Sequence, residues 1–153
     1  MNNTGSTIGL DVVYVKHDAA LLAIIVPANY SDAGIQFFTP NDFSQQLAYM
    51  HHPAGKKIPP HVHNPVPREV RHTLEVLFIR KGKLRVDFYT ENEEYLQSRI
   101  LFRGDAILLV SGGHGFEMLE PTEMIEVKQG PYAGEEDKRR FEGVNCAGIR
   151  LKQ

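Results

Sequence analysis

The sequence predicts an all-β domain. Three observations carry this prediction: short runs with apolar residues at every second position, turn residues between those runs, and no sustained helical period. The 13 glycines and nine prolines are spread along the chain and divide it into short segments. Regular short strands separated by turns are typical of a sandwich or a barrel. We therefore expect β-strands with at most short helical segments.

The clearest strands lie in the middle of the chain. In residues 84–89, Leu84, Val86 and Phe88 share one face, and polar or charged groups fall on the other. Residues 75–80 are largely apolar on both faces, which is typical of a strand buried on two sides. Further strands are expected at 12–16, 21–26, 35–39, 46–52, 106–110 and 124–127, and the best helical candidate is 135–141.

Length and charge limit the classes of protein to which the chain can belong. Its 153 residues suffice for one buried core, and 17 basic against 19 acidic side chains leave a net charge of −2. This balance offers no basic surface, so neither nucleic acid nor a membrane is expected as a partner. A single cysteine, Cys146, excludes an internal disulfide and fits a cytoplasmic location. No apolar run approaches the about 20 residues of a membrane span.

Histidine is distributed unevenly along the chain. Of seven histidines, five fall within residues 51–72 and a sixth is His114. His61 and His63 are separated by one residue, so on a strand both imidazoles would share a face and reach one ion. Glu75 begins an otherwise apolar strand, where an unpaired carboxylate is costly to bury and a metal ion would remove that cost.

These residues resemble the two motifs of the cupin superfamily. His61-Val62-His63, then Glu75 and, after six further residues, Gly82 are similar to the first motif. The run from Gly104 to His114 is similar to the second motif. Together the two motifs cover the central two fifths of the chain, in the order that the family has.

The resemblance implies a cupin-type double-stranded β-helix, that is, a jelly-roll barrel. It implies one domain over residues 1–153, with N-terminal strands in 1–33, the barrel core at about 34–130 and a C-terminal extension in 131–153. It also implies one divalent transition metal ion (Fe, Mn, Ni, Zn or Cu) inside the barrel, held by His61, His63, Glu75 and His114. A homodimer is a further implication, because small cupins commonly pair through their sheets.

The first motif departs from the family in its spacing. Eleven residues separate His63 from Glu75, a much longer gap than the family has, so an insertion lies beside the expected site. This insertion makes Glu69 an alternative ligand. Glu75 is preferred because it keeps the six-residue spacing to Gly82 and leads into the buried strand.

The second motif departs in its residues. Val110 replaces the proline of the family, His114 comes one residue early, and Met118 stands where an asparagine is often found. The two glycines at 112 and 113 could absorb the shorter spacing, because glycine allows backbone conformations that other residues avoid. His114 is therefore kept as the third imidazole.

The insertion and one nearby strand supply candidate ligand-binding residues. Arg68, Arg71 and His72 follow the two histidines closely, in a segment that prolines stiffen. Their cationic groups could receive the carboxylate or phosphate of a small anionic ligand. Alternatively, the segment could form a dimer contact, or a surface loop in which Arg68 pairs with Glu69. Tyr49 and His51 share one face at the end of an expected strand, where they could line the ligand cavity or pack in the barrel.

Cupin-like barrels carry many activities, so the resemblance leaves the reaction open. The first candidate is a small metal-dependent enzyme, an oxygenase, isomerase or lyase, acting on a small anionic or oxygen-rich substrate. The second is a non-catalytic metal or small-molecule binding protein. The third is a metal-free sugar-nucleotide isomerase or epimerase with a histidine as general base. A complete set of four metal ligands favours the first two, and we expect the enzyme.

Overall fold

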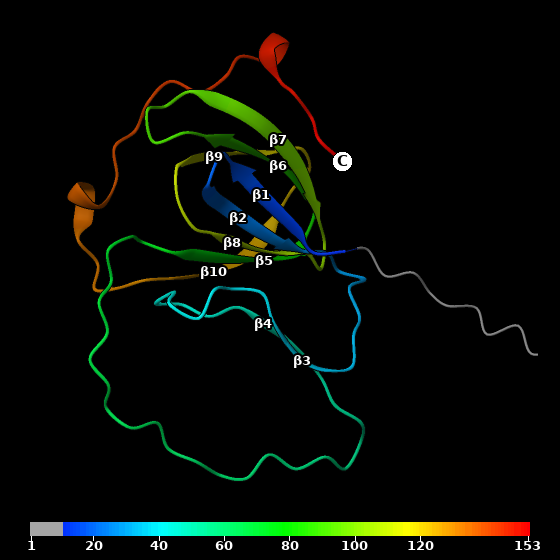
Figure 1. The fold of residues 1–153 in the computed structure, drawn as a ribbon. Helices are drawn as coiled ribbons and strands as arrows, with labels where there is room; N and C mark the ends of the chain where they lie inside the picture. Colours follow the sequence, from blue (N-terminus) through cyan, green and yellow to red (C-terminus); the bar gives the residue numbers. More distant parts are fainter. Residues whose placement is uncertain (1–10) are drawn as a thin grey trace, which may run out of the picture.

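The structure is a computed structural model that describes residues 11–153, so the expected N-terminal strands of 1–33 lie partly outside it. One sheet has the strand order β1 (Val13–His17), β2 (Ala20–Val26), β8 (Ala106–Leu109), β5 (Glu75–Lys81), β10 (Glu123–Lys128). A second has the order β7 (Tyr95–Phe102), β6 (Lys83–Tyr89), β9 (Gly113–Met118), and β3 (Gly34–Phe37) pairs with β4 (Ala48–His51) (Figure 1). Every strand pair is antiparallel and no α-helix is found among these residues, which confirms the all-β prediction. The described residues form no closed barrel, so the jelly-roll barrel that the resemblance implies stays a prediction.

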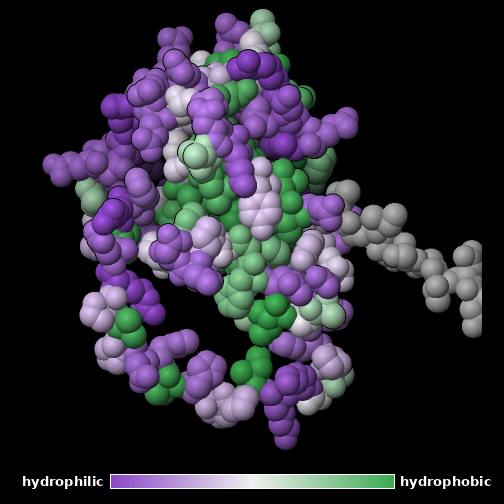
Figure 2. Space-filling view, viewed as in Figure 1, coloured by the Kyte–Doolittle hydropathy of each residue, from purple (hydrophilic) through white to green (hydrophobic). Residues whose placement is uncertain are grey.

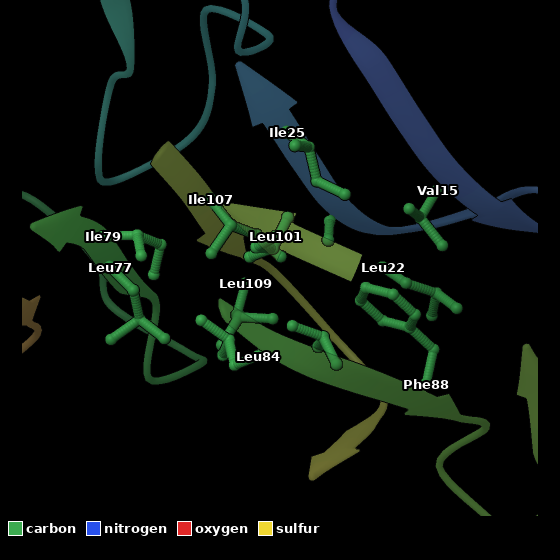
Figure 3. Close-up of a cluster of buried hydrophobic side chains, with 12 residues drawn as sticks. Val15, Leu22, Ile25, Leu77, Ile79, Leu84, Phe88, Leu101, Ile107 and Leu109 are labelled. Atoms are coloured by element: carbon green, nitrogen blue, oxygen red, sulfur yellow. The ribbon is translucent and has the colours of Figure 1, made fainter. Parts of the chain in front are cut away.

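The two larger sheets enclose one apolar core (Figure 3). Leu84, Val86 and Phe88 are at most 1% exposed, as their alternation along the strand predicted. Burying each such side chain contributes about 1.5–3 kcal/mol. The cluster consists of Val15, Leu22, Ala23, Ile25, Leu77, Ile79, Leu84, Val86, Phe88, Leu101, Ile107 and Leu109.

The β3–β4 ribbon covers the opposite face of the five-stranded sheet and buries a second cluster there. Val76, Ile24 and Leu108 come from the sheet, and Tyr49 of β4 packs against them. The strand at 75–80 is thus buried on two sides over its first half, as predicted. Phe78 departs from this pattern, because it is 42% exposed and is not part of this cluster.

The last residues, 131–153, which we call the C-terminal strap, cover the outer face of the three-stranded sheet β7-β6-β9 (Figure 1). The Phe141 ring packs edge to face on Tyr89 with centroids 5.0 Å apart, and the Val144 amide donates to the Tyr89 hydroxyl at 3.0 Å. Further along, Ser98 and Leu151 form a parallel bridge. The helical stretch expected at 135–141 is limited to the 3-10 turn η1 (Gly134–Asp137).

The sandwich is open along the edge strand β9. Phe116 and Met118 stand opposite Val86 and Leu84, so they share the face of the core, yet they are 37% and 47% exposed. Their exposure follows from the strand order, because β9 has β6 on one side and no partner on the other within residues 11–153.

Residues 52–74, which we call the histidine segment, contain no strand. The segment swings away from the sheets as a wide arc, and Figure 2 shows open space between it and the body (Figures 1 and 2). Five prolines, at positions 53, 59, 60, 65 and 67, remove backbone donors that a strand ladder would use.

Candidate metal centre

Two of the four expected metal ligands are in contact. Glu75 is the first residue of β5 and His114 the second of β9, so the pair joins the two sheets at one end of the sandwich. Their donor atoms, His114 Nε2 and Glu75 Oε2, lie 3.2 Å apart. With metal–ligand bonds of about 2.1 Å, neighbouring donors are about 3.0 Å apart in octahedral and about 3.4 Å apart in tetrahedral coordination. The pair therefore fits two adjacent positions around one ion.

The Glu75 carboxyl group is held in its ionised form. A hydrogen bond from His114 lowers the pKa of Glu75 below its ordinary value, burial acts in the opposite direction, and the nearby charge of Lys128 adds to the lowering. Lys128 Nζ lies 3.9 Å from Glu75 Oε1, because β10 places Lys128 directly opposite Glu75. A carboxylate that is ionised at neutral pH is in the form that a metal ion requires.

A cavity of about 920 Å³ lies beside this pair. Glu75 and His114 form part of its wall, together with Arg71 and His72 of the histidine segment and Asp137 of the C-terminal strap. Arg71 and His72 were predicted to bind ligand, and both reach the cavity. Its size is that of a pocket for a small molecule.

His61 and His63 lie apart from this pair, on the exposed histidine segment. Their ring centroids are 5.3 Å apart, so the two imidazoles are neighbours without a strand. His61 Nδ1 lies 3.0 Å from the carbonyl oxygen of Pro59. If Nδ1 donates that bond, the lone pair of Nε2 is free for a metal ion. Residues 11–153 hold no group of three or more side chains placed to share one ion.

The alternative ligand Glu69 is engaged elsewhere. Arg71 donates to both of its carboxylate oxygens, from Nε at 3.0 Å and from Nη2 at 3.1 Å. Arg68 is exposed, and its Nη1 lies 3.5 Å from the carbonyl oxygen of Val66. The surface ion pair considered for this segment is thus present, with Arg71 rather than Arg68 as its cation.

Tyr49 and His51 lie on β4, away from the cavity beside Glu75. Tyr49 packs edge to face on Tyr30, with centroids 5.1 Å apart, within the second apolar cluster. His51 is exposed, and its Nδ1 lies 3.2 Å from the carbonyl oxygen of Asp32. Of the two alternatives for this face, lining the ligand cavity or packing, Tyr49 therefore follows the second.

Lys128 and Asp137 are functional candidates that the sequence did not reveal. Lys128 Nζ donates to Asp137 Oδ2 at 3.3 Å, and Thr73 Oγ1 donates to Asp137 Oδ1 at 2.9 Å. The sequence predicted the strand β10, but the register that sets Lys128 opposite Glu75 depends on the strand order, which the sequence does not show. The mixed charges of residues 135–140 indicated only a solvated face.

Comparison with protein-family models, with curated proteins and with solved structures gives no match for this chain. None of the helical segments within residues 11–153 has the length and apolar character needed to cross a membrane. The features of this chain that bear on its function are therefore its sequence motifs and the geometry of Glu75 and His114.

Proposed function

We propose that this protein is a cupin-like jelly roll that binds one divalent transition metal ion with His61, His63, Glu75 and His114. The contact between Glu75 and His114 carries the proposal. The resemblance to the cupin motifs implies that these two residues bind one ion. The sheets then bring their donor atoms to 3.2 Å at the wall of a cavity, although 38 residues separate them in the sequence.

The open edge of β9 offers a place where His61 and His63, the other two proposed ligands, would join the site. An edge strand presents unpaired backbone groups that can accept another strand. Residues 60–64, added to β9 in extended form, would turn His61 and His63 to one face of the sheet. The same addition would cover Phe116 and Met118 and supply a strand that the jelly roll needs. Prolines are tolerated on such an edge, because its outer donors face solvent.

The ion would provide the chemistry and the cavity would provide the selectivity. A metal ion bound there acts as a Lewis acid toward an oxygen of a small substrate. Three imidazoles and one carboxylate leave coordination positions open for that oxygen or for water. Arg71 and His72 lie on the cavity wall, and Arg71 would receive a negatively charged substrate on release from Glu69. Carboxylates such as Glu91 and Glu93 line the same cavity. The class of function that fits best is a small metal-dependent enzyme.

Elemental analysis of untagged protein, purified without added metal, tests the proposal. We expect about one equivalent of a first-row transition metal per chain, removable by a chelator. His61→Ala and His114→Ala should each lose it. His17→Ala is the matched control, since His17 lies on β1 beside Asp18 and should keep the metal. Full metal content in the His61→Ala, His63→Ala double variant would overturn the proposal.

The same contact favours a second function that needs no metal. A carboxylate orients and polarises an imidazole, so His114 with Glu75 has the arrangement of a general base facing a cavity. This function corresponds to the metal-free isomerase or epimerase. It predicts that a chelator has no effect and that His61 and His63 are dispensable, and the metal analysis above therefore separates the two functions.

A further inference from the structure

A chain of side-chain contacts links the C-terminal strap to the proposed metal ligands. Asp137 of the strap accepts hydrogen bonds from Thr73, at 2.9 Å, and from Lys128, at 3.3 Å. Lys128 in turn lies 3.9 Å from Glu75, whose other oxygen contacts His114. Thr73 lies near the end of the histidine segment, which carries the remaining two imidazoles. Asp137 therefore contacts that segment directly and is linked to Glu75 through Lys128.

The two ion pairs of Lys128 are partly shielded from solvent, which strengthens their electrostatic interaction. The side chains of Lys128, Asp137 and Glu75 are 23%, 16% and 11% exposed. The neighbouring charge pair of the strap, Glu135 with Arg140, is 82% and 69% exposed. Charges interact more strongly where water is partly excluded. The position of the Lys128 ammonium therefore affects the electrostatic potential at Glu75 more than the exposed pair of Glu135 and Arg140 does.

Lys128 is shared between two carboxylates and lies closer to Asp137 than to Glu75. If the negative charge of Asp137 were removed, the ammonium would move onto Glu75, its remaining partner. There it would compete with a metal ion for the carboxylate oxygens and repel the dication directly. Asp137 thus holds a competing cation at a distance from the ligand.

We propose that Asp137 is a positioning residue that sets the metal affinity of the site by restraining Lys128. This inference rests on the proposed metal-binding function. It assigns to the C-terminal strap a role that covering the smaller sheet does not require. The strap would control how readily Glu75 accepts a metal ion.

The dissociation constant for Zn²⁺, measured by competition with a chromophoric chelator, tests the inference. Asp137→Asn should weaken Zn²⁺ binding by about tenfold, the lower end for groups that orient a metal ligand. Lys128→Gln should bind Zn²⁺ at least as tightly as the wild type, because the competing cation is gone. The Asp137→Asn, Lys128→Gln double variant should match Lys128→Gln, since no ammonium is left to restrain.

The double variant separates positioning from a merely structural role. If Asp137 only anchored the strap, the double variant would bind as weakly as Asp137→Asn. Glu135→Gln is the matched control, because it makes the same charge change in the same 3-10 turn, its carboxylate pairs with Arg140, and its Zn²⁺ affinity should equal that of the wild type.

Three results would overturn the inference while the proposed function stands: Asp137→Asn binds Zn²⁺ as tightly as the wild type, Lys128→Gln binds more weakly, or the double variant stays weak. Asp137→Glu restores the negative charge and should recover affinity relative to Asp137→Asn, which gives a second reading if the asparagine variant unfolds. A wild-type protein that binds no stoichiometric Zn²⁺ would instead refute the proposed function, and the inference with it.

Discussion

Gly112→Ala should destabilise the protein strongly, although it adds a single methyl group. Gly112 has a φ of +70°, a conformation that costs alanine about 1–2 kcal/mol. Its new Cβ would lie 2.4 Å from the carbonyl oxygen of Tyr89 and 3.0 Å from Leu22 Cδ2. Ordinary contacts are about 3.5–4.0 Å, so backbone must move, and overpacking of this kind costs about 1–3 kcal/mol. The total is about 3 kcal/mol.

The comparison variant is Gly115→Ala, three residues further along. A Cβ at Gly115 would meet no heavy atom within 4 Å, and alanine in a strand is about 0.5–1 kcal/mol better than glycine. Urea unfolding and thermal melts followed by circular dichroism measure both variants. Gly112→Ala should lower the melting temperature by about 6–12 °C, since 1 kcal/mol corresponds to about 2–4 °C at this size. Equal stabilities would refute the account of this turn.

Asp87→Ala should cost about 3 kcal/mol in urea unfolding. It leaves Arg85 buried with only the half-exposed Glu117 at 2.7 Å, and removing one member of a buried pair costs about 3–5 kcal/mol. The Arg85→Met, Asp87→Leu variant should lose less, and a larger loss would contradict the pair's role. Zn²⁺ binding should weaken as the pH is lowered, because protons compete with the metal ion for the imidazole lone pairs. A flat profile between pH 5.5 and 7.5 would argue against histidine ligands.

The strands that could be predicted are those whose pattern is local. In β6 the alternation of Leu84, Val86 and Phe88 decides both the strand and its inward face. β9 was not predicted, because its sequence, with glycines at 113 and 115, has little alternation of its own, and its strand form depends on pairing with β6. β7 was missed as well, since a buried Ser98 that donates to Asp87 interrupts its apolar pattern.

The part of the site that could be predicted from the sequence is the part that lies in the two motifs. The spacing of Glu75 and Gly82 and the position of His114 predicted a pair that the sheets bring into contact. The arrangement of His61 and His63 relative to that pair stays a prediction, because their segment is rich in proline and makes no ladder with the sheets. Contacts such as Lys128 with Asp137 depend on strand order and on the path of the strap, and no local pattern encodes either.

Hydrogen exchange of the backbone amides, with and without one equivalent of Zn²⁺, tests the central claim most directly. If metal binding brings the histidine segment onto the open edge, the alternate amides within residues 61–64 that turn toward β9 should exchange rapidly without metal and slowly with it. The free-edge amides of β9 should become protected at the same time, and the His114→Ala variant should show neither change. Bound Zn²⁺ with unchanged exchange in both places would contradict the claim.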